Sequence, residues 1–356
     1  MDVSVCIRDI EEDVLRLLRF MDVRNVDLRP HFIPHSWKEL NESNIHDSLK
    51  VEEIKKKLAE IVKVLRKNGF HVNSTDGPAI QRFFMDDSLP LDDKIENVAE
   101  YYKDFIDILS ELEIPIMLAM ISLRGFGPED LPGRYGKIQP RGYLMGAFSF
   151  HKFEEKTAGV DKIKGGIKTF EDLLAIHVKL LKRIAPYAEK RNVKIAIHPD
   201  DPPIEHESIP PGYTSLNKFR KLLDAVNSQN VGLVFCVGTF AEAGEDIYGA
   251  LELLMKERKV FHVHLRNIKY NLPKHKCYDE VMIDEGDINL IRILKILKDN
   301  DYEGTINPDH VPIYHYNNND ELRSPTCWNL NDKRCREGYL YTIGYIKGII
   351  AALNDS

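Results

Sequence analysis

The chain has 356 residues, of which 43% are hydrophobic, and this proportion is sufficient for a large buried core. A net charge of −7 and the lack of a basic block argue against nucleic acid as the main partner. No apolar run approaches membrane-spanning length, so no membrane association is expected. No signal peptide is recognisable, and the five cysteines lack the spacing of a disulfide framework. They are therefore expected to be reduced thiols in a cytoplasmic protein.

Short β-branched runs alternate with longer amphipathic stretches along the chain. Eight runs have the length and flanking turn residues of strands: 3–7, 25–29, 70–75, 114–121, 193–198, 231–236, 260–265 and 303–308. Apolar residues recur at helical spacing in other stretches: 51–67, 91–111, 170–190, 215–227, 245–258, 288–300 and 338–353. This order predicts a single α/β domain over residues 1–356, a (β/α)8 or TIM barrel. A doubly wound open sheet is the alternative, but no glycine-rich phosphate turn supports it.

Two segments interrupt the alternation of strands and helices. Residues 122–168 follow the fourth strand and are rich in glycine, proline and aromatic residues. Residues 311–337 follow the eighth strand and are polar. Long connections at the carboxyl ends of barrel strands usually form lids or binding loops, so both are predicted to be insertion loops that close over a site. The second is also a candidate contact between subunits of a homo-oligomer.

Four potential metal ligands stand at the ends of the last four predicted strands. They are His198, Cys236, His264 and Asp309. Singly, a histidine or cysteine at a strand end is more often structural, and an aspartate there is more often a cap or turn residue. In a barrel, however, the ends of successive strands face one shared mouth. Four ligand types at equivalent positions therefore favour one divalent-metal site, for which the thiolate makes Zn²⁺ competitive.

Alternation along the seventh strand separates two faces. His262, His264 and Arg266 share one parity, which we expect to face the barrel interior, while the apolar residues between them pack on helices. His264 lies nearer the mouth and is the better ligand, and His262 is expected one layer below as a hydrogen-bonded group. Arg266 would project into the mouth, where a guanidinium can hold a substrate carboxylate. A surface salt bridge is the alternative for Arg266.

Further polar residues adjoin the candidate ligands. In the segment HPDDPP, Asp200 or Asp201 is a candidate to orient a ligand histidine or bind substrate hydroxyls, although a proline-stiffened turn is the simpler reading. His310 follows Asp309 directly, and a histidine beside a metal-bound substrate suits general acid or base chemistry. Tyr339 opens the terminal helix, but spacing alone does not single it out.

The second half of the chain resembles the mannonate dehydratase family. The resemblance is carried, from about residue 193 onward, by HPDDPP at 198–203, FCVGT at 235–239, HLRN at 264–267, EGDI at 285–288, PDH at 308–310 and GY at 338–339. It implies a xylose-isomerase-like barrel, Mn²⁺ or Fe²⁺ as the metal, and dehydration of D-mannonate to 2-keto-3-deoxy-D-gluconate in hexuronate degradation. The implied ligands are His198, Cys236, His264 and Asp309, and the implied catalytic pair is His310 and Tyr339.

The chemistry implied is loss of the C2 proton followed by loss of hydroxide from C3. Some positions depart from the family pattern: its N-terminal FRWYG motif is absent, its arginine before PDH is Asn307, and its glycine after PDH is Val311. A histidine usually present before the GD pair is replaced near Ile283. These departures keep three alternatives open: a dehydratase for another aldonate, a sugar isomerase or epimerase, and a sugar-acid binding protein without catalysis.

Overall fold

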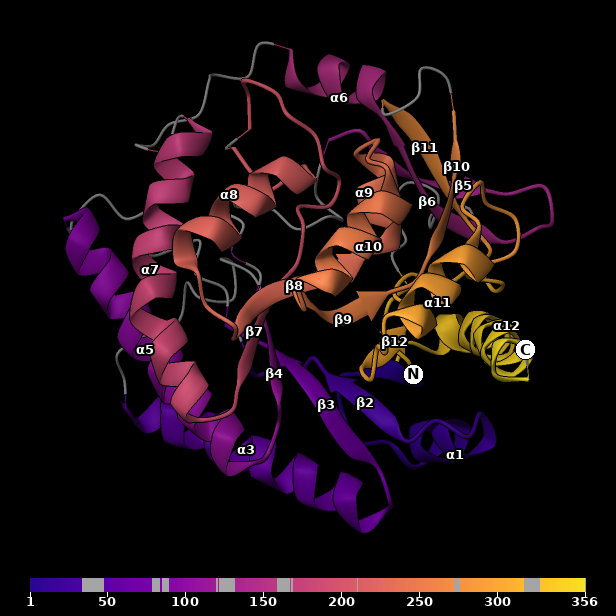
Figure 1. Cartoon of the computed structure of the whole chain (residues 1–356). Coiled ribbons are helices and arrows are strands. Elements are labelled where there is room, and N and C mark those ends of the chain that lie inside the picture. The colour runs from indigo at the N-terminus through magenta and orange to yellow at the C-terminus, as the bar shows by residue number, and fades with distance from the viewer. Residues whose placement is uncertain are drawn as a thin grey trace.

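The computed structural model describes residues 1–33, 48–78, 84, 90–119, 121, 132–158, 167, 169–209, 211–271, 276–316 and 327–355, without the side chains of 48–50. Eight parallel strands close into a barrel in the order β1–β12–β9–β8–β7–β4–β3–β2 (Figure 1). Their bounds are β1 Asp2–Ile7, β2 Asn25–Leu28, β3 His71–Asp76, β4 Ile116–Ala119, β7 Lys194–Ile197, β8 Val231–Cys236, β9 Val260–His264 and β12 Thr305–Asn307. The predicted (β/α)8 barrel is confirmed.

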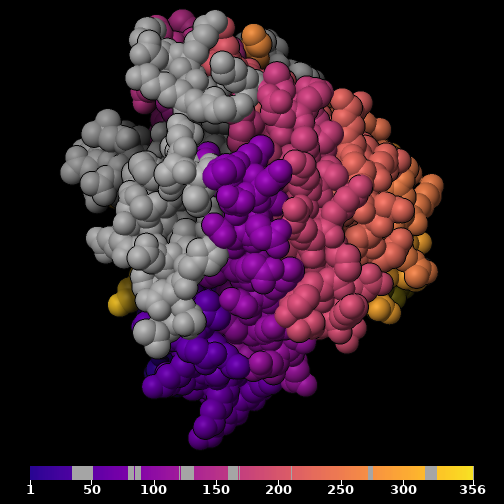
Figure 2. Space-filling view, turned by 90° about the vertical axis from the view of Figure 1, so that its left-hand side faces the viewer, coloured from indigo at the N-terminus to yellow at the C-terminus, as the bar shows by residue number. Residues whose placement is uncertain are grey.

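Helices surround the barrel, and most of them pack against its outer face. Their bounds are α1 Glu12–Phe20, α3 Ser48–Lys67, α5 Leu91–Glu111, α6 Phe150–Thr157, α7 Phe170–Lys190, α8 Leu216–Val226, α9 Val237–Glu242, α10 Ile247–Lys256, α11 Leu290–Asp299 and α12 Arg336–Asn354. Helix α7 packs between α5 and α8. Figure 2 shows successive segments side by side across this face, from purple through magenta to orange. This is the arrangement that successive βα units impose.

Local sequence signals set the ends of the outer helices. Thr169 and Asp172 form a reciprocal capping box at the start of α7, and the hydroxyl of Ser215 accepts a hydrogen bond at the start of α8. Asn227 ends α8 in the left-handed conformation, with φ of 49°, directly before the turn into β8. These signals explain why the predicted helix limits lie within a few residues of those observed.

The segments around the barrel mouth contain a second sheet that the sequence did not predict. It is antiparallel, in the order β10–β11–β6–β5, with bounds β5 Arg134–Ile138, β6 Leu144–Ser149, β10 Asn267–Tyr270 and β11 Cys277–Val281. The described part of the predicted insertion loop over 122–168 holds β5, β6 and α6. These strands pair with the hairpin β10–β11 from the connection after β9, a long-range partnership that local patterning does not reveal.

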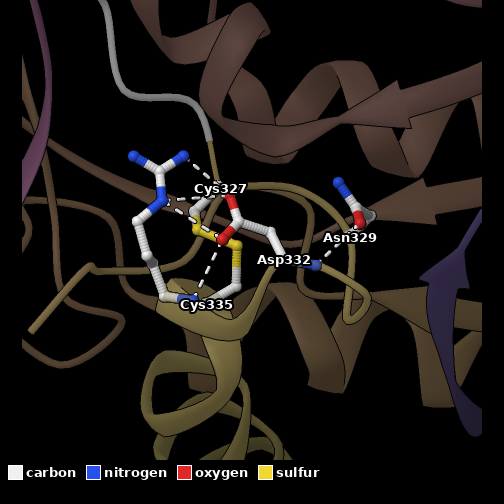
Figure 3. Close-up of a disulfide and its surroundings, with 5 residues drawn as sticks. Cys327, Asn329, Asp332 and Cys335 are labelled. Atoms are coloured by element: carbon white, nitrogen blue, oxygen red, sulfur yellow. Dashed lines mark hydrogen bonds and ion pairs between the residues drawn. A yellow bond between two sulfur atoms is a disulfide. The ribbon is translucent and has the colours of Figure 1, made fainter. Parts of the chain in front are cut away.

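The polar segment after β12 is closed by a disulfide. Cys327 and Cys335 are bonded, with their Cα atoms 5.5 Å apart, and Asp332 caps the short 3₁₀ helix Lys333–Cys335 between them (Figure 3). The expectation that every cysteine is a reduced thiol is therefore wrong for this pair. The chain turns back on itself between the two cysteines. Their separation of eight residues did not by itself predict that they would be bonded. Cys6, Cys236 and Cys277 are free.

None of the described helices is both long and apolar enough to cross a membrane. Residues 122–131, 159–166 and 317–326, which belong to the two predicted lid segments, lie outside the described residues. The described remainder of the second segment joins the sheet, because Ile313 and Leu144 exchange backbone hydrogen bonds of 2.9 and 2.8 Å. Both segments are therefore tied together at the mouth of the barrel.

Candidate metal centre and active site

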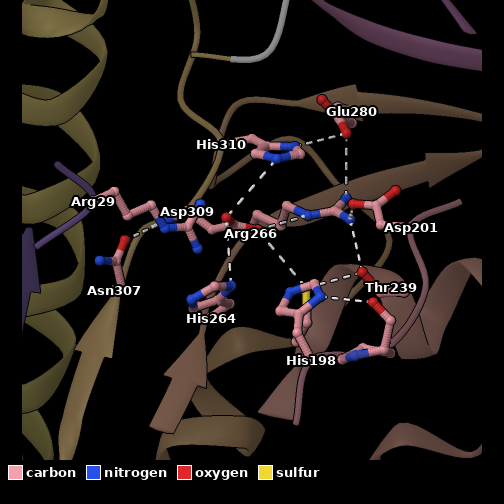
Figure 4. Close-up of polar contacts among 12 residues, drawn as sticks. Arg29, His198, Asp201, Thr239, His264, Arg266, Glu280, Asn307, Asp309 and His310 are labelled. Atoms are coloured by element: carbon pink, nitrogen blue, oxygen red, sulfur yellow. Dashed lines mark hydrogen bonds and ion pairs between the residues drawn. The ribbon is translucent and has the colours of Figure 1, made fainter. Parts of the chain in front are cut away.

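The four predicted ligands converge at the carboxyl end of the barrel. His198, Cys236 and His264 each offer a ligand atom, and these atoms lie within 4.8 Å of one another. Asp309 lies against them, with Oδ1 3.4 Å from His264 Nδ1 and Oδ2 3.7 Å from Cys236 Sγ. They follow or end β7, β8, β9 and β12, and Figure 4 shows His198, His264 and Asp309 turned toward the same space.

The protonation chemistry of this group suits a cation. Burial lowers the pKa of His198 and holds that of His264 well below its ordinary value, so both imidazoles are neutral and retain a lone pair. His198 Nδ1 lies 2.6 Å from the carbonyl of Pro199 and must donate to it, which leaves Nε2 as the ligand atom. His264 Nδ1 is buried without a hydrogen-bond partner among the described residues. Two imidazoles, a thiol and a carboxylate therefore fit a divalent transition metal.

Asp309 is held by its own backbone and by neighbouring charges. Its φ of 62° lies in the left-handed region, and its backbone N–H donates to the side chain of Asn307 at 2.8 Å. Burial acts to raise the pKa of Asp309, but the positive charges of His310 and Arg266 outweigh it and hold that pKa well below its usual range. The carboxylate is therefore ionised, and these contacts hold Asp309 in place.

A buried polar network supports the centre from inside the barrel. Asp27 accepts hydrogen bonds from Ser4 at 2.5 Å, from Ser74 at 2.5 Å and from Asn307 at 2.7 Å. His262 lies in the same network, 3.4 Å from Asp27, with its ring centroid 5.2 Å from that of His264. The prediction that His262 is an interior, hydrogen-bonded residue below His264 is confirmed.

Arg266 is enclosed by carboxylates. Its guanidinium donates to Asp309 at 3.1 Å, to Asp201 at 2.8 Å and to Glu242, and its side chain has no exposed area. Gly238 makes this possible, because a Cβ there would lie 2.6 Å from the guanidinium carbon. A guanidinium with this many partners has little capacity for a substrate, which disfavours the predicted direct contact of Arg266 with a carboxylate.

The second sheet brings two charged side chains to the mouth. Arg134 of β5 contacts Asp201 at 2.8 Å and Glu280 of β11 at 2.6 Å. Glu280 in turn accepts from His310 Nδ1 at 2.9 Å (Figure 4). Burial acts to lower the pKa of His310, but Asp309 and Glu280 outweigh it and raise that pKa overall. Asp201 thus links the two arginines, and Glu280 orients the imidazole.

Of the remaining predicted residues, Tyr339 is buried on a helix and Asp200 lies in a loop. Tyr339 is fully buried on α12, its hydroxyl has no hydrogen-bond partner among the described residues, and burial raises its pKa well above the ordinary value. The negative charge of Asp309 also contributes to the raised pKa of Tyr339. Asp200 accepts a hydrogen bond of 2.6 Å from the backbone of Tyr213 and so braces its own loop.

Sequence reasoning missed several residues of the site. Arg29, Arg134, Glu242 and Glu280 are all buried or nearly so at the mouth, and none stands in a recognisable motif. Arg29 follows β2, so its position at a strand end was the one signal that could have identified it. Arg134 and Glu280 lie on the second sheet, whose existence was not foreseen.

Comparison with known proteins gives a consistent result. A family model described as D-mannonate dehydratase matches residues 156–356. Mannonate dehydratase of Streptococcus equi subsp. zooepidemicus is 32% identical over 173 residues, 47% of this chain and 46% of the relative. That of Geobacillus thermodenitrificans is 26% identical over 288 residues, 71% of this chain and 74% of the relative. The match thus spans about half the length of the first of these relatives.

Solved structures show the same fold. Mannonate dehydratase of Streptococcus suis superposes with a TM-score of 0.74 at 21% identity, covering 98% of this chain and 93% of that one. The IOLI protein with a bound zinc atom gives a TM-score of 0.56 at 15% identity, covering 99% and 97%. D-psicose 3-epimerase gives 0.55 at 13%, covering 98% and 99%. At these identities the superpositions establish the architecture.

Proposed function

The chain belongs to the D-mannonate dehydratase family, and on that premise we propose that it is a metal-dependent hydro-lyase acting on a sugar acid. The proposed reaction converts D-mannonate to 2-keto-3-deoxy-D-gluconate and water. The observation that carries the proposal is the convergence of His198, Cys236, His264 and Asp309 beside His310. The proposed cofactor is Mn²⁺ or Fe²⁺, and the thiol keeps Zn²⁺ as a candidate.

Two proton transfers must accompany the elimination. A base takes the proton from C2, and an acid protonates the hydroxyl that leaves C3 as water. The resulting enol then gains a proton at C3 and loses the proton of its C2 hydroxyl to become the ketone. A bound divalent cation would supply Lewis acidity that stabilises negative charge developing next to the substrate carboxylate. Each well-placed proton transfer contributes about 10²–10⁴-fold to the rate.

We assign the base to His310 and the acid to Tyr339. Glu280 holds His310 Nδ1 and leaves Nε2, 3.8 Å from Asp309 Oδ1, on the side of the metal centre. Tyr339 retains its proton because burial disfavours the phenolate, and that hydroxyl proton is not committed to another described residue. Asp201 and Arg266 act through their mutual ion pair, by fixing Asp309 and its surroundings.

An assay of product formation tests this function. Metal-free protein is reloaded with Mn²⁺, Fe²⁺ or Zn²⁺ and given D-mannonate and a panel of other aldonates, and 2-keto-3-deoxy acid is measured. We expect product from D-mannonate, and loss of at least about 10²-fold in His310→Asn. His315→Asn, which alters a histidine exposed at 69% of its side chain, is the matched control. No product from any aldonate with any metal contradicts the proposal.

The isomerase or epimerase alternative keeps the same fold and metal centre. It is favoured by the superposition on D-psicose 3-epimerase, whose likeness extends to the architecture alone. Conversion of an aldose or ketose without loss of water would identify it. Binding of aldonates without any turnover, and with no effect of His310→Asn, would identify a binding protein instead.

A further inference from the structure

We propose that Arg29 binds the carboxylate of the sugar acid and so selects acids over neutral sugars. This inference rests on the proposed function and names the residue that recognises the substrate class. Arg29 directly follows β2, at the same end of the barrel as the four candidate ligands. It interacts electrostatically with Asp309, and Figure 4 shows its side chain beside Asp309 and Asn307.

The other arginines that reach the centre are occupied. Arg134 and Arg266 have no exposed side-chain area, and each contacts at least two carboxylates. Arg29 retains 19% of its side-chain area and has one close carboxylate, Asp76, 3.1 Å from its Nε. Among the described residues, its ion pair is made at Nε, and none is made at its two terminal nitrogens. Those nitrogens are the paired donors that a carboxylate recognises.

Arg29 is held in a defined orientation before any substrate binds. Asp76, at the end of β3, forms an ion pair with Nε of Arg29. The ring of Trp328 lies 5.0 Å from the guanidinium carbon of Arg29 and 4.2 Å from that of Arg8. Trp328 itself is fixed through its neighbours, since Cys327 accepts a hydrogen bond from Val311 and Leu330 donates one to Cys6. A preorganised guanidinium loses less entropy on binding a carboxylate.

The position of Arg29 also suits the proposed chemistry. The carboxylate of an aldonate is bonded to C2, so a cation that binds it fixes the carbon that loses its proton. Figure 4 shows Arg29 beside Asp309, so a carboxylate held by Arg29 would lie close to the candidate metal ligands. The same charge would leave a neutral sugar without a partner, which gives discrimination between the two classes.

Binding and kinetics of Arg29→Gln, Arg29→Lys and the control Arg16→Gln test the inference. Arg16 is a surface residue of α1 with 73% of its side chain exposed. Metal-loaded protein is titrated by calorimetry with D-mannonate and with its neutral amide, and KM and kcat are measured for D-mannonate. We expect Arg29→Gln to weaken D-mannonate binding and raise KM by about 10- to 100-fold, while binding of the amide changes little.

The expected order of affinity for D-mannonate is wild type, then Arg29→Lys, then Arg29→Gln, because lysine keeps the charge but loses the paired geometry. Metal content measured on each variant confirms an intact centre. An unchanged ratio of D-mannonate to amide affinity in Arg29→Gln overturns the inference, even if the enzyme is a dehydratase. Wild-type protein that binds aldonates without converting them overturns the proposed function, while the affinity ratio still decides the role of Arg29. Failure to bind any aldonate overturns both.

Discussion

At the scale of single residues, the candidate site depends on how each buried charged side chain is paired with its neighbours. The carboxylate of Glu280 is wholly buried, yet it is not isolated, because Arg134 and His310 both donate to it. Burial acts to raise the pKa of Glu280, but His310 and Arg134 outweigh it and depress that pKa. The ionised carboxylate therefore determines which nitrogen of His310 faces the centre, a choice that governs whether this imidazole can accept a proton.

Replacement of Glu280 by glutamine tests this positioning. Glu280→Gln keeps the shape but removes the charge, so we expect kcat to fall by about 10- to 100-fold with a smaller change in KM. Kinetics on metal-loaded protein, with metal content measured in parallel, provide the readout. Glu154→Gln, on the exposed surface of α6, should match the wild type. If Glu280→Gln changes KM alone and preserves kcat, Glu280 does not act through His310.

At the scale of elements, short helices and the second sheet place groups that the barrel strands alone cannot supply. Helix α9 begins directly after Cys236 and carries Thr239, whose hydroxyl donates to Cys236 Sγ at 3.0 Å, and Glu242, which binds Arg266. The same helix needs Gly238 where it passes the guanidinium. The FCVGT segment thus serves the site through its glycine and threonine as well as its cysteine.

Two glycine-to-alanine replacements separate this packing effect from helix propensity. Gly238→Ala would bring Cβ within 2.6 Å of the Arg266 guanidinium, and we expect it to destabilise the fold by about 1–3 kcal/mol. Gly348→Ala, in α12, meets no heavy atom within 4 Å and should stabilise by up to about 1 kcal/mol. Urea denaturation of both variants measures the difference. Similar free energies of unfolding for the two would show that Arg266 tolerates displacement.

At the scale of the whole molecule, the candidate metal centre joins residues from four successive strands of the barrel. The ligands range from His198 to Asp309, and the strands that bear them, β7, β8, β9 and β12, are neighbours in the closed barrel. An ion bound only by the folded arrangement stabilises that arrangement by mass action. Stability should therefore depend on the concentration of free metal.

Metal-dependent stability provides the test of the centre that is independent of activity. Mn²⁺ at about 100 times its dissociation constant should add roughly 2.7 kcal/mol, which raises the unfolding temperature by a few degrees. Cys236→Ser should reduce this shift and the bound metal, whereas Cys277→Ser, at a free cysteine of β11, should leave both unchanged. Thermal scans with and without chelator measure the shift. An equal shift in both variants would place the metal elsewhere.

The sequence by itself determined the barrel, and it predicted four candidate ligands whose side chains lie together in the structure. Each of the eight barrel strands is a short β-branched run between helix signals, and a ligand type stands at a strand end in four consecutive units. Such features are local, so they can be recognised in short segments of the sequence. Motif order added His310 and Tyr339, whose roles remain proposals.

Only the tertiary structure decided how the charges at the mouth are shared. The pairing of β6 with β11 joins residues more than a hundred positions apart and delivers Arg134 and Glu280 to Asp201 and His310. The enclosure of Arg266 and the open terminal nitrogens of Arg29 depend on these same long-range contacts. Arg29 is the better candidate for a substrate carboxylate because Arg266 is already neutralised by neighbouring carboxylates. Those neighbours come from distant parts of the chain, and local sequence patterns do not encode them.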